Sequence, residues 1–254
     1  MPLRRIHPDR VEIDPAEAIA GLDWAGLAPA DRPYLAANMV ATADGRAAVE
    51  GRTRAISSDT DRAIFHNLRT QADAIMAGAG TIRSERYGPL IKTDELRNKR
   101  IREGLDPNPL AVIVSGRLHL PEDVGLLQDP DSHVVILTQS DGELSGVRAQ
   151  VDYLRAEPGP WDPRPQLEAL RAQHGVRSIL CEGGPSLNES LIREGLVDEL
   201  FLSIAPKLAG GPPLTMLTGD PLAAPLGTQL VSLYEHEGHL FARYRLQESL
   251  QALE

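Results

Sequence analysis

The chain has 254 residues, enough for one large domain or two small ones, and its hydrophobic content of 42% allows a sizeable core. A formal net charge of −10 argues against a nucleic-acid partner, because nucleic-acid-binding proteins carry a basic surface. No run approaches the roughly 18 apolar residues that a membrane helix needs. No apolar segment follows Arg4 and Arg5, as a secretory signal requires, and Cys181 is the single cysteine. We therefore expect a cytoplasmic protein without disulfides and without a membrane partner.

The chain begins with a segment rich in Pro, Asp and Ala, residues 1–32. This composition predicts an arm on the surface, with a short helix over 15–22. The core is expected to start at Tyr34, where a buried strand runs to Thr42 and ends in the turn Asp44-Gly45.

Strands and helices are then expected to alternate. Strands are predicted over 74–77, 110–114, 134–138, 151–154, 179–181 and 200–206, and helices over 57–68, 165–173 and 185–194. The highly charged residues 91–109 indicate a mobile surface segment, either a flap over a site or a plain solvated insertion. The last strands, 229–236 and 240–246, are predicted to form a hairpin.

The alternation predicts an α/β fold with a mostly parallel sheet flanked by helices, to which the C-terminal hairpin adds an antiparallel edge. Composition does not break along the sequence, and no internal repeat divides it. We expect one domain over residues 33–248, preceded by the arm of residues 1–32.

The most informative stretch, residues 179–190, combines a short apolar run with Glu182, Gly183, Gly184 and Pro185. Proline is tolerated at the first position of a helix, so this stretch predicts a strand, a tight turn and a helix. The free N–H groups of such a helix start form a seat for a phosphate. Glu182 stands at the carboxyl end of the strand, where open α/β sheets bind their ligands. The alternative is an ordinary connection with two turn glycines.

Two further glycine turns, Asp44-Gly45 and Gly78–Thr81, are expected on the same edge of the sheet. The second does not match the dinucleotide fingerprint, which needs glycine where Arg83 stands, and the sequence has no Walker A loop. His236 and His239 are close in sequence but lack further ligands at a usable spacing, so no metal site is expected.

Several ordered segments together resemble the reductase domain of bacterial riboflavin biosynthesis, the 5-amino-6-(5-phosphoribosylamino)uracil reductases. The resemblance runs from about Arg32 to Leu246 and rests on Arg32–Tyr34, Ala43–Arg46, Ile56–Ser58, Leu68-Arg69, Ala74–Thr81, Val112–Ser115, Glu182–Leu187, Gly195–Leu200 and Ile204–Leu208. It implies the dihydrofolate-reductase fold, a small heterocyclic substrate, NADPH as cofactor and a homodimer.

Asp44 lies in a turn at the edge of the sheet and is therefore the nearest candidate for a catalytic acid, with a simple turn-forming role as the alternative. The resemblance also implies roles for individual residues. The residues expected to bind NADPH are Val40, Ala55, Thr81, Glu85, Ser115, Gly183, Gly184, Pro185, Ser186, Leu187, Asn188, Glu189 and Ser190. Those expected to face the substrate are Thr53, Arg69, Leu90 and Glu182. Arg117 is our own candidate for the 2′-phosphate of the cofactor, with a surface salt bridge as the alternative.

Three functions remain open from the sequence: a stand-alone pyrimidine reductase, a relative that reduces another heterocycle such as dihydrofolate, and a non-catalytic nucleotide-binding protein. The sequence has Asn38 where the family often has lysine, and Ala55 where a bulky aromatic residue is sometimes found. Lys92 and Arg86 are candidates to replace the missing positive charge. The zinc signature of a fused deaminase does not occur in this sequence.

Overall fold

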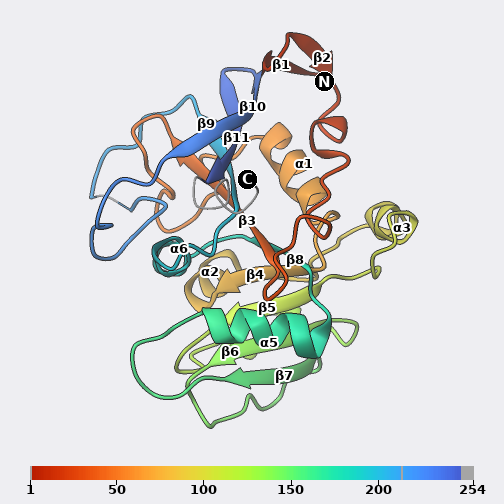
Figure 1. Ribbon diagram of the computed structural model, residues 1–254, viewed down its shortest axis with the longest axis vertical. Coiled ribbons are helices and arrows are strands. Elements are labelled where there is room, and N and C mark those ends of the chain that lie inside the picture. The colour runs from red at the N-terminus through yellow and green to blue at the C-terminus, as the bar shows by residue number, and fades with distance from the viewer. Residues whose placement is uncertain (1, 213, 247–254) are drawn as a thin grey trace.

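A computed structural model describes residues 2–212 and 214–246, and its centre is one sheet in the order β2-β1-β10-β11-β9-β3-β8-β4-β5-β6-β7 (Figure 1). The strands are β1 Leu3–His7, β2 Val11–Ile13, β3 Tyr34–Thr42, β4 Ala74–Gly78, β5 Leu110–Val114, β6 His133–Thr138, β7 Gln150–Arg155, β8 Ser178–Cys181, β9 Glu199–Ala205, β10 Thr228–His236 and β11 His239–Leu246. The helices are α1 Asp59–Leu68, α2 Ala79–Glu85, α3 Asp94–Arg102, α4 Gly125–Gln128, α5 Arg164–His174 and α6 Pro185–Arg193, with a 3-10 turn at Glu17–Ile19.

The strands from β9 to β7 pair in parallel, and β11, β10, β1 and β2 extend the sheet with antiparallel pairings. The predicted fold class is therefore confirmed. Because parallel strands end at one edge, the carboxyl ends of β3, β8, β4 and β5 lie next to one another. Residues 247 and 248 of the predicted domain lie outside the described residues.

Helices cover both faces of the parallel part of the sheet. On one face, Ile64 and Leu68 of α1 join Ile82 of α2 in the core. On the other face, Leu167 and Leu170 of α5 pack in the core with apolar residues of α6. Ser58 caps α1 by accepting a hydrogen bond from the backbone of Asp61, and such a cap fixes where the helix begins. In the described ranges, no helix is long and apolar enough to cross a membrane.

The first 32 residues do not form a surface arm, and that prediction is wrong. Strand β1 pairs with β10, and β2 pairs with β1, so the segment extends the sheet. Leu3 and Trp24 are fully buried, and the Trp24 indole donates a hydrogen bond to buried Glu199. Apolar burial at these few positions outweighs the Pro- and Asp-rich composition of the segment.

Residues 91–109 contain helix α3, which their charged composition did not predict. Thr93 caps it, and its charged residues Asp94 and Lys99 lie at the ends that favour them. Arg100 is fully buried and donates hydrogen bonds to the backbone carbonyls of Arg69 and Ala72. Helix α3 therefore packs through an arginine that binds the main chain. A packed helix is usually recognised in a sequence by an apolar face, which α3 lacks.

Candidate active site

The turn between β8 and α6 leaves the start of the helix open. Gly183 and Gly184 have positive φ angles of 86° and 103°, which residues with a side chain rarely adopt. A Cβ on Gly183 would lie 2.9 Å from the sulfur of Met39, so the turn also needs the glycine for space. Pro185 occupies the first turn of α6, and the helix has no cap from a side chain. The amide end of α6 therefore faces outward with its partial positive charge available to an anion.

Helix α2 begins beside this turn. Gly78 ends β4 and precedes α2, which likewise has no cap from a side chain, and the Gly78 N–H donates to the carbonyl of Gly183 at 2.9 Å. A Cβ on Gly184 would lie 3.4 Å from the hydroxyl oxygen of Thr81, so the two turns pack closely. Two helix starts thus lie side by side at the carboxyl edge of the sheet, where their dipoles add at one place.

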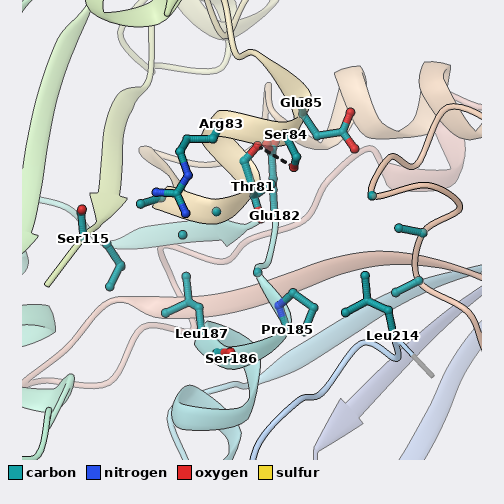
Figure 2. Close-up of a pocket in the computed structure, with 18 of the residues that line it drawn as sticks. Thr81, Arg83, Ser84, Glu85, Ser115, Glu182, Pro185, Ser186, Leu187 and Leu214 are labelled. Atoms are coloured by element: carbon teal, nitrogen blue, oxygen red, sulfur yellow. Dashed lines mark hydrogen bonds between the residues drawn. The ribbon is translucent and has the colours of Figure 1, made fainter. Parts of the chain in front are cut away.

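Both helix starts line a cavity of about 600 Å³, a size typical of small-molecule sites. Figure 2 shows Arg83 and Ser115 on one side of it, Glu85 and Leu214 on the other, and Ser186 and Leu187 below. Arg117 and His119 also line it, and the guanidinium of Arg83 donates to the carbonyl of His119 at 2.5 Å. The cavity therefore combines backbone donors at its centre with positive side chains at one end.

Glu182, which also lines this cavity, belongs to a buried ion pair with Arg69. The Arg69 guanidinium donates to both oxygens of Glu182, at 2.6 and 2.7 Å, and the Tyr87 hydroxyl donates to Glu182 Oε2 at 2.6 Å. Arg69 also donates to the carbonyl of Leu90 and lies 4.4 Å from the ring centroid of Phe65. Burial, followed by the charge of Glu182, raises the pKa of Tyr87 well above its usual value, so its hydroxyl keeps its proton.

A second cavity, of about 470 Å³, adjoins the first. Both cavities are lined by Met39, Ala47, Thr53, Thr81, Glu85 and Glu182, which therefore mark the junction between them. Arg54, Arg62 and Lys92 line only the second cavity, and their charges suit an anionic group there. Burial, aided by Arg69 and Lys92, lowers the pKa of His66 to about 4, so this lining residue is neutral at physiological pH.

Comparison with known proteins identifies the family to which this chain belongs. Residues 33–237 match the model of the RibD C-terminal domain. The chain is 35% identical to the 2,5-diamino-6-ribosylamino-4(3H)-pyrimidinone 5′-phosphate reductase of Archaeoglobus fulgidus, over 71% of this chain and 83% of that protein. The protein belongs to the RibD C-terminal domain family. It is similar over 75% of its length to riboflavin biosynthesis protein RibD of Mycobacterium tuberculosis, with 29% identity, and spans 47% of that longer protein.

Among solved structures, a pyrimidine reductase-like protein from Corynebacterium diphtheriae shares the fold with a TM-score of 0.73 and 24% identity. The alignment covers 92% of this chain and 99% of that one. As a member of the RibD C-terminal domain family, the protein is a reductase that acts on a small molecule, and this class implies a nicotinamide cofactor.

The structure brings most of the predicted cofactor residues of this RibD-type reductase together. Those that line the first cavity are Thr81, Glu85, Ser115, Gly184, Pro185, Ser186, Leu187 and Ser190. Gly183 shapes the turn behind it, whereas Val40 lines only the second cavity. Ala55 lines neither cavity, and its carbonyl accepts from Lys207. Asn188 and Glu189 also lie away from the lining: Asn188 donates to the carbonyl of Met216, and Glu189 pairs with Arg193.

Of the predicted substrate residues, Thr53, Arg69 and Glu182 line the second cavity. Leu90 does not, because its side chain is buried and only its carbonyl contributes, by holding Arg69. Lys92 lines this cavity, but Arg86 does not and instead pairs with Asp123 on the surface. No local pattern in the sequence pointed to Arg54 or Arg62, which lie on a loop and on the outer side of α1.

The structure gives Asp44 a different position from the one its predicted catalytic role requires. Asp44 lines neither cavity. Its carboxylate accepts hydrogen bonds from the Thr42 hydroxyl and from the backbone N–H groups of Ala209 and Gly210. These bonds, the one from Thr42 first, lower the pKa of Asp44 to about 2, so it carries no proton to donate at neutral pH. Asp44 therefore holds the loop after β9 in place. This is a structural role, close to the turn-forming role that was the alternative to catalysis.

Proposed function

We propose that the protein transfers a hydride from NADPH to a 5′-phosphorylated ribosylaminopyrimidine, either the 2,5-diamino-4(3H)-pyrimidinone form or the 5-amino uracil form. The observation that carries this proposal is the pair of adjoining cavities, one with two open helix starts and one with several positive side chains. The named activity of the Archaeoglobus relative supports the substrate class. The acceptor is the ribose carbon of the ring-opened imine, and the cofactor supplies the hydride when bound.

The first cavity fits a dinucleotide. Ser186 and Leu187 follow Pro185 in the first turn of α6, where the N–H groups have no carbonyl partner within the helix, and the start of α2 lies beside them. We assign the pyrophosphate to this position, because two helix dipoles and several N–H groups converge there. The backbone hydrogen bond from Gly78 to Gly183 fixes the spacing of the two helix starts before any ligand binds.

The end of the cavity near β5 supports NADPH over NADH. Arg83 and Arg117 both line it, together with Ser115, which is buried at the end of the strand. Arginine forms strong, charge-assisted hydrogen bonds to phosphate, and only NADPH carries a 2′-phosphate. We therefore retain Arg117 as a residue for the 2′-phosphate and add Arg83.

The second cavity fits the phosphorylated substrate. Lys92 and Arg54 are exposed at its mouth, and Arg62 follows on α1. These side chains replace the charge that Asn38 does not supply. At the inner end, Arg69 and Tyr87 already hold Glu182 in place by hydrogen bonds, so its side chain is fixed in position to orient the substrate.

This arrangement needs little acid–base chemistry from the protein. Holding hydride donor and acceptor in reacting geometry contributes on the order of 7–11 kcal/mol at the upper limit. Thr53 and Thr81, which lie at the junction of the cavities, are positioned to contact both molecules. The Thr53 hydroxyl and backbone N–H both donate to Glu85, which fixes the loop over the junction.

The proposal extends to location and assembly. We propose that the protein works in the cytoplasm, as expected from its sequence. We also propose a homodimer, as the family resemblance suggested, formed through the antiparallel part of the sheet around β9 and β11. Sedimentation of the purified protein tests the dimer, because a monomer at all concentrations contradicts it.

The function is tested by following NADPH oxidation with the purified protein and each of the two pyrimidine substrates. We expect turnover with at least one of them, none with the dephosphorylated compound at the same concentration, and none with dihydrofolate. Turnover with dihydrofolate alone, or no turnover with either pyrimidine despite tight NADPH binding, contradicts the proposal.

A further inference from the structure

Two histidines and an aspartate from distant parts of the sequence meet near the amino ends of the parallel strands. The two cavities lie at the opposite edge of the sheet, at the carboxyl ends. His133 begins β6, Asp152 lies on the edge strand β7, and His174 is the last residue of α5. Strands β6 and β7 pair in parallel with Val135 opposite Asp152, so His133 and Asp152 lie two positions apart on adjacent strands. Helix α5 returns across the sheet, and its end therefore lies near the strand starts.

The three side chains form a compact group of donor atoms. Within the part of the chain that the structure describes, one potential ligand atom from each lies within 4.8 Å of the other two. His133 Nε2 and Asp152 Oδ2 are hydrogen-bonded to each other at 2.7 Å, a contact that a bound cation would replace, and the ring centroids of His133 and His174 are 5.9 Å apart. The side chains of His133 and Asp152 are 37% and 43% exposed, so an ion reaches them directly from solvent.

The surroundings favour a cation. His133 and His174 lie at a surface cavity of about 410 Å³ that is also lined by Asp73, Asp106 and Asp131. The carboxyl end of α5, where His174 stands, adds the negative end of the helix dipole. Arg100 also lines the cavity, but its guanidinium is buried and donates to backbone carbonyls. Acidic side chains therefore outnumber basic ones around the group.

We propose that His133, Asp152 and His174 bind a zinc-class divalent cation, with water completing a four-coordinate site. Two imidazole nitrogens and one carboxylate are a donor set that Zn²⁺ accepts, whereas Mg²⁺ and Ca²⁺ prefer oxygen ligands. The ion joins β6, the edge strand β7 and α5, and so stabilises the outer end of the sheet. This role is separate from hydride transfer.

Isothermal titration of the full-length protein with ZnCl₂ tests the site. We expect saturable binding of one Zn²⁺ per protomer. In thermal unfolding, the midpoint should rise when Zn²⁺ is added and fall back with EDTA, and Mg²⁺ should have neither effect. Removing a ligand in His174→Ala or Asp152→Asn should weaken binding at least about tenfold, which is the lower end of the effect of altering even outer-shell partners. Asp131→Asn is the matched control, because it removes a neighbouring negative charge but no ligand, and it should retain the affinity.

Cobalt provides a second readout that does not depend on stability. Co²⁺ in a tetrahedral site with these donors gives visible absorption bands that His133→Ala should abolish, with the metal-free thermal midpoint of each variant confirming that it is folded. Zn²⁺ binding that is absent, that is not saturable, or that is as strong in His133→Ala and His174→Ala as in the parent protein overturns the proposal. So does an equal loss of affinity in Asp131→Asn and Asp152→Asn, since that outcome indicates only general attraction of a cation.

Discussion

The two adjoining cavities are built from different parts of the polypeptide. The first is formed largely by backbone: two glycine turns and two helix starts, which bind through N–H groups and dipoles. The second is formed by side chains, with the buried ion pair of Arg69 and Glu182 at its inner end and Arg62 and Lys92 further out. A site made of backbone tolerates substitutions around it, whereas a site made of charged side chains depends on each of them.

The largest loss of stability and turnover is expected from a substitution in the buried network of Arg69, Glu182 and Tyr87. Glu182→Gln leaves the Arg69 guanidinium without its carboxylate, and breaking such a buried pair costs about 3–5 kcal/mol of stability. Urea unfolding should show this loss, and reductase turnover should fall to background. Asp123→Asn is the control, because it breaks the exposed pair with Arg86 and should leave the unfolding midpoint nearly unchanged. Equal midpoints for Glu182→Gln and the parent protein would show that the network does not hold the site.

A negative charge at the start of α6 should separate binding from folding. Ser186 is exposed at this helix start. In Ser186→Glu, the carboxylate interacts favourably with the positive end of the helix dipole, so the helix stays stable, but it repels the pyrophosphate. We expect NADPH affinity to fall at least about tenfold, or ~1.4 kcal/mol, without loss of thermal stability. Ser186→Gln, of the same size but uncharged, should bind within a few-fold of the parent. This test is cleaner than replacing Gly184, whose positive φ makes any side chain disruptive.

Removing one positive side chain from each cavity should give opposite kinetic results. A hydrogen bond to a charged group contributes about 1.5–3 kcal/mol, so Arg117→Ala should raise the KM for NADPH by roughly 10- to 100-fold. The KM for the pyrimidine should stay the same. Lys92→Ala should raise the KM for the pyrimidine and leave the KM for NADPH the same. If either variant raises both KM values equally, the cavities do not bind separate molecules.

The smallest effect is expected at Asp44, outside both cavities. Asp44→Asn should keep turnover close to that of the parent, because the carboxylate anchors a loop. The pKa of Asp44 is lowered from 3.8 to about 2, so its contribution to stability is present above pH 3.8 and lost as the pH falls through 2. The difference in thermal midpoint between parent and variant should therefore shrink over this range. A loss of turnover without a change in stability would restore the catalytic role.

The same contrast explains which features could be predicted from the sequence. Gly183, Gly184 and Pro185 indicate a backbone-built site, because turn glycines and a helix-starting proline are local signals. The parallel sheet followed from alternating apolar segments for the same reason. Helix α2 was missed, because Gly78 and Gly80 are typical of a turn and the helix lacks a capping side chain.

Features that depend on distant contacts were not predictable from local pattern. The burial of Arg100, the bonds of Asp44 to residues 209 and 210, and the meeting of His133 with His174 all join segments far apart in the sequence. Arg62 is one of several charged residues of α1, and only the fold places it at a cavity. Long-range placement decides the role of a charged side chain more than its neighbours in sequence do.

The most direct test of the central claim is a crystal structure of the full-length protein with NADP⁺ and the phosphorylated pyrimidine. We expect the pyrophosphate at the N–H groups of Ser186 and Leu187, the 2′-phosphate near Arg117, and the pyrimidine in the second cavity beside Glu182. A dinucleotide bound in the second cavity, or a pyrophosphate away from the starts of α2 and α6, would contradict it.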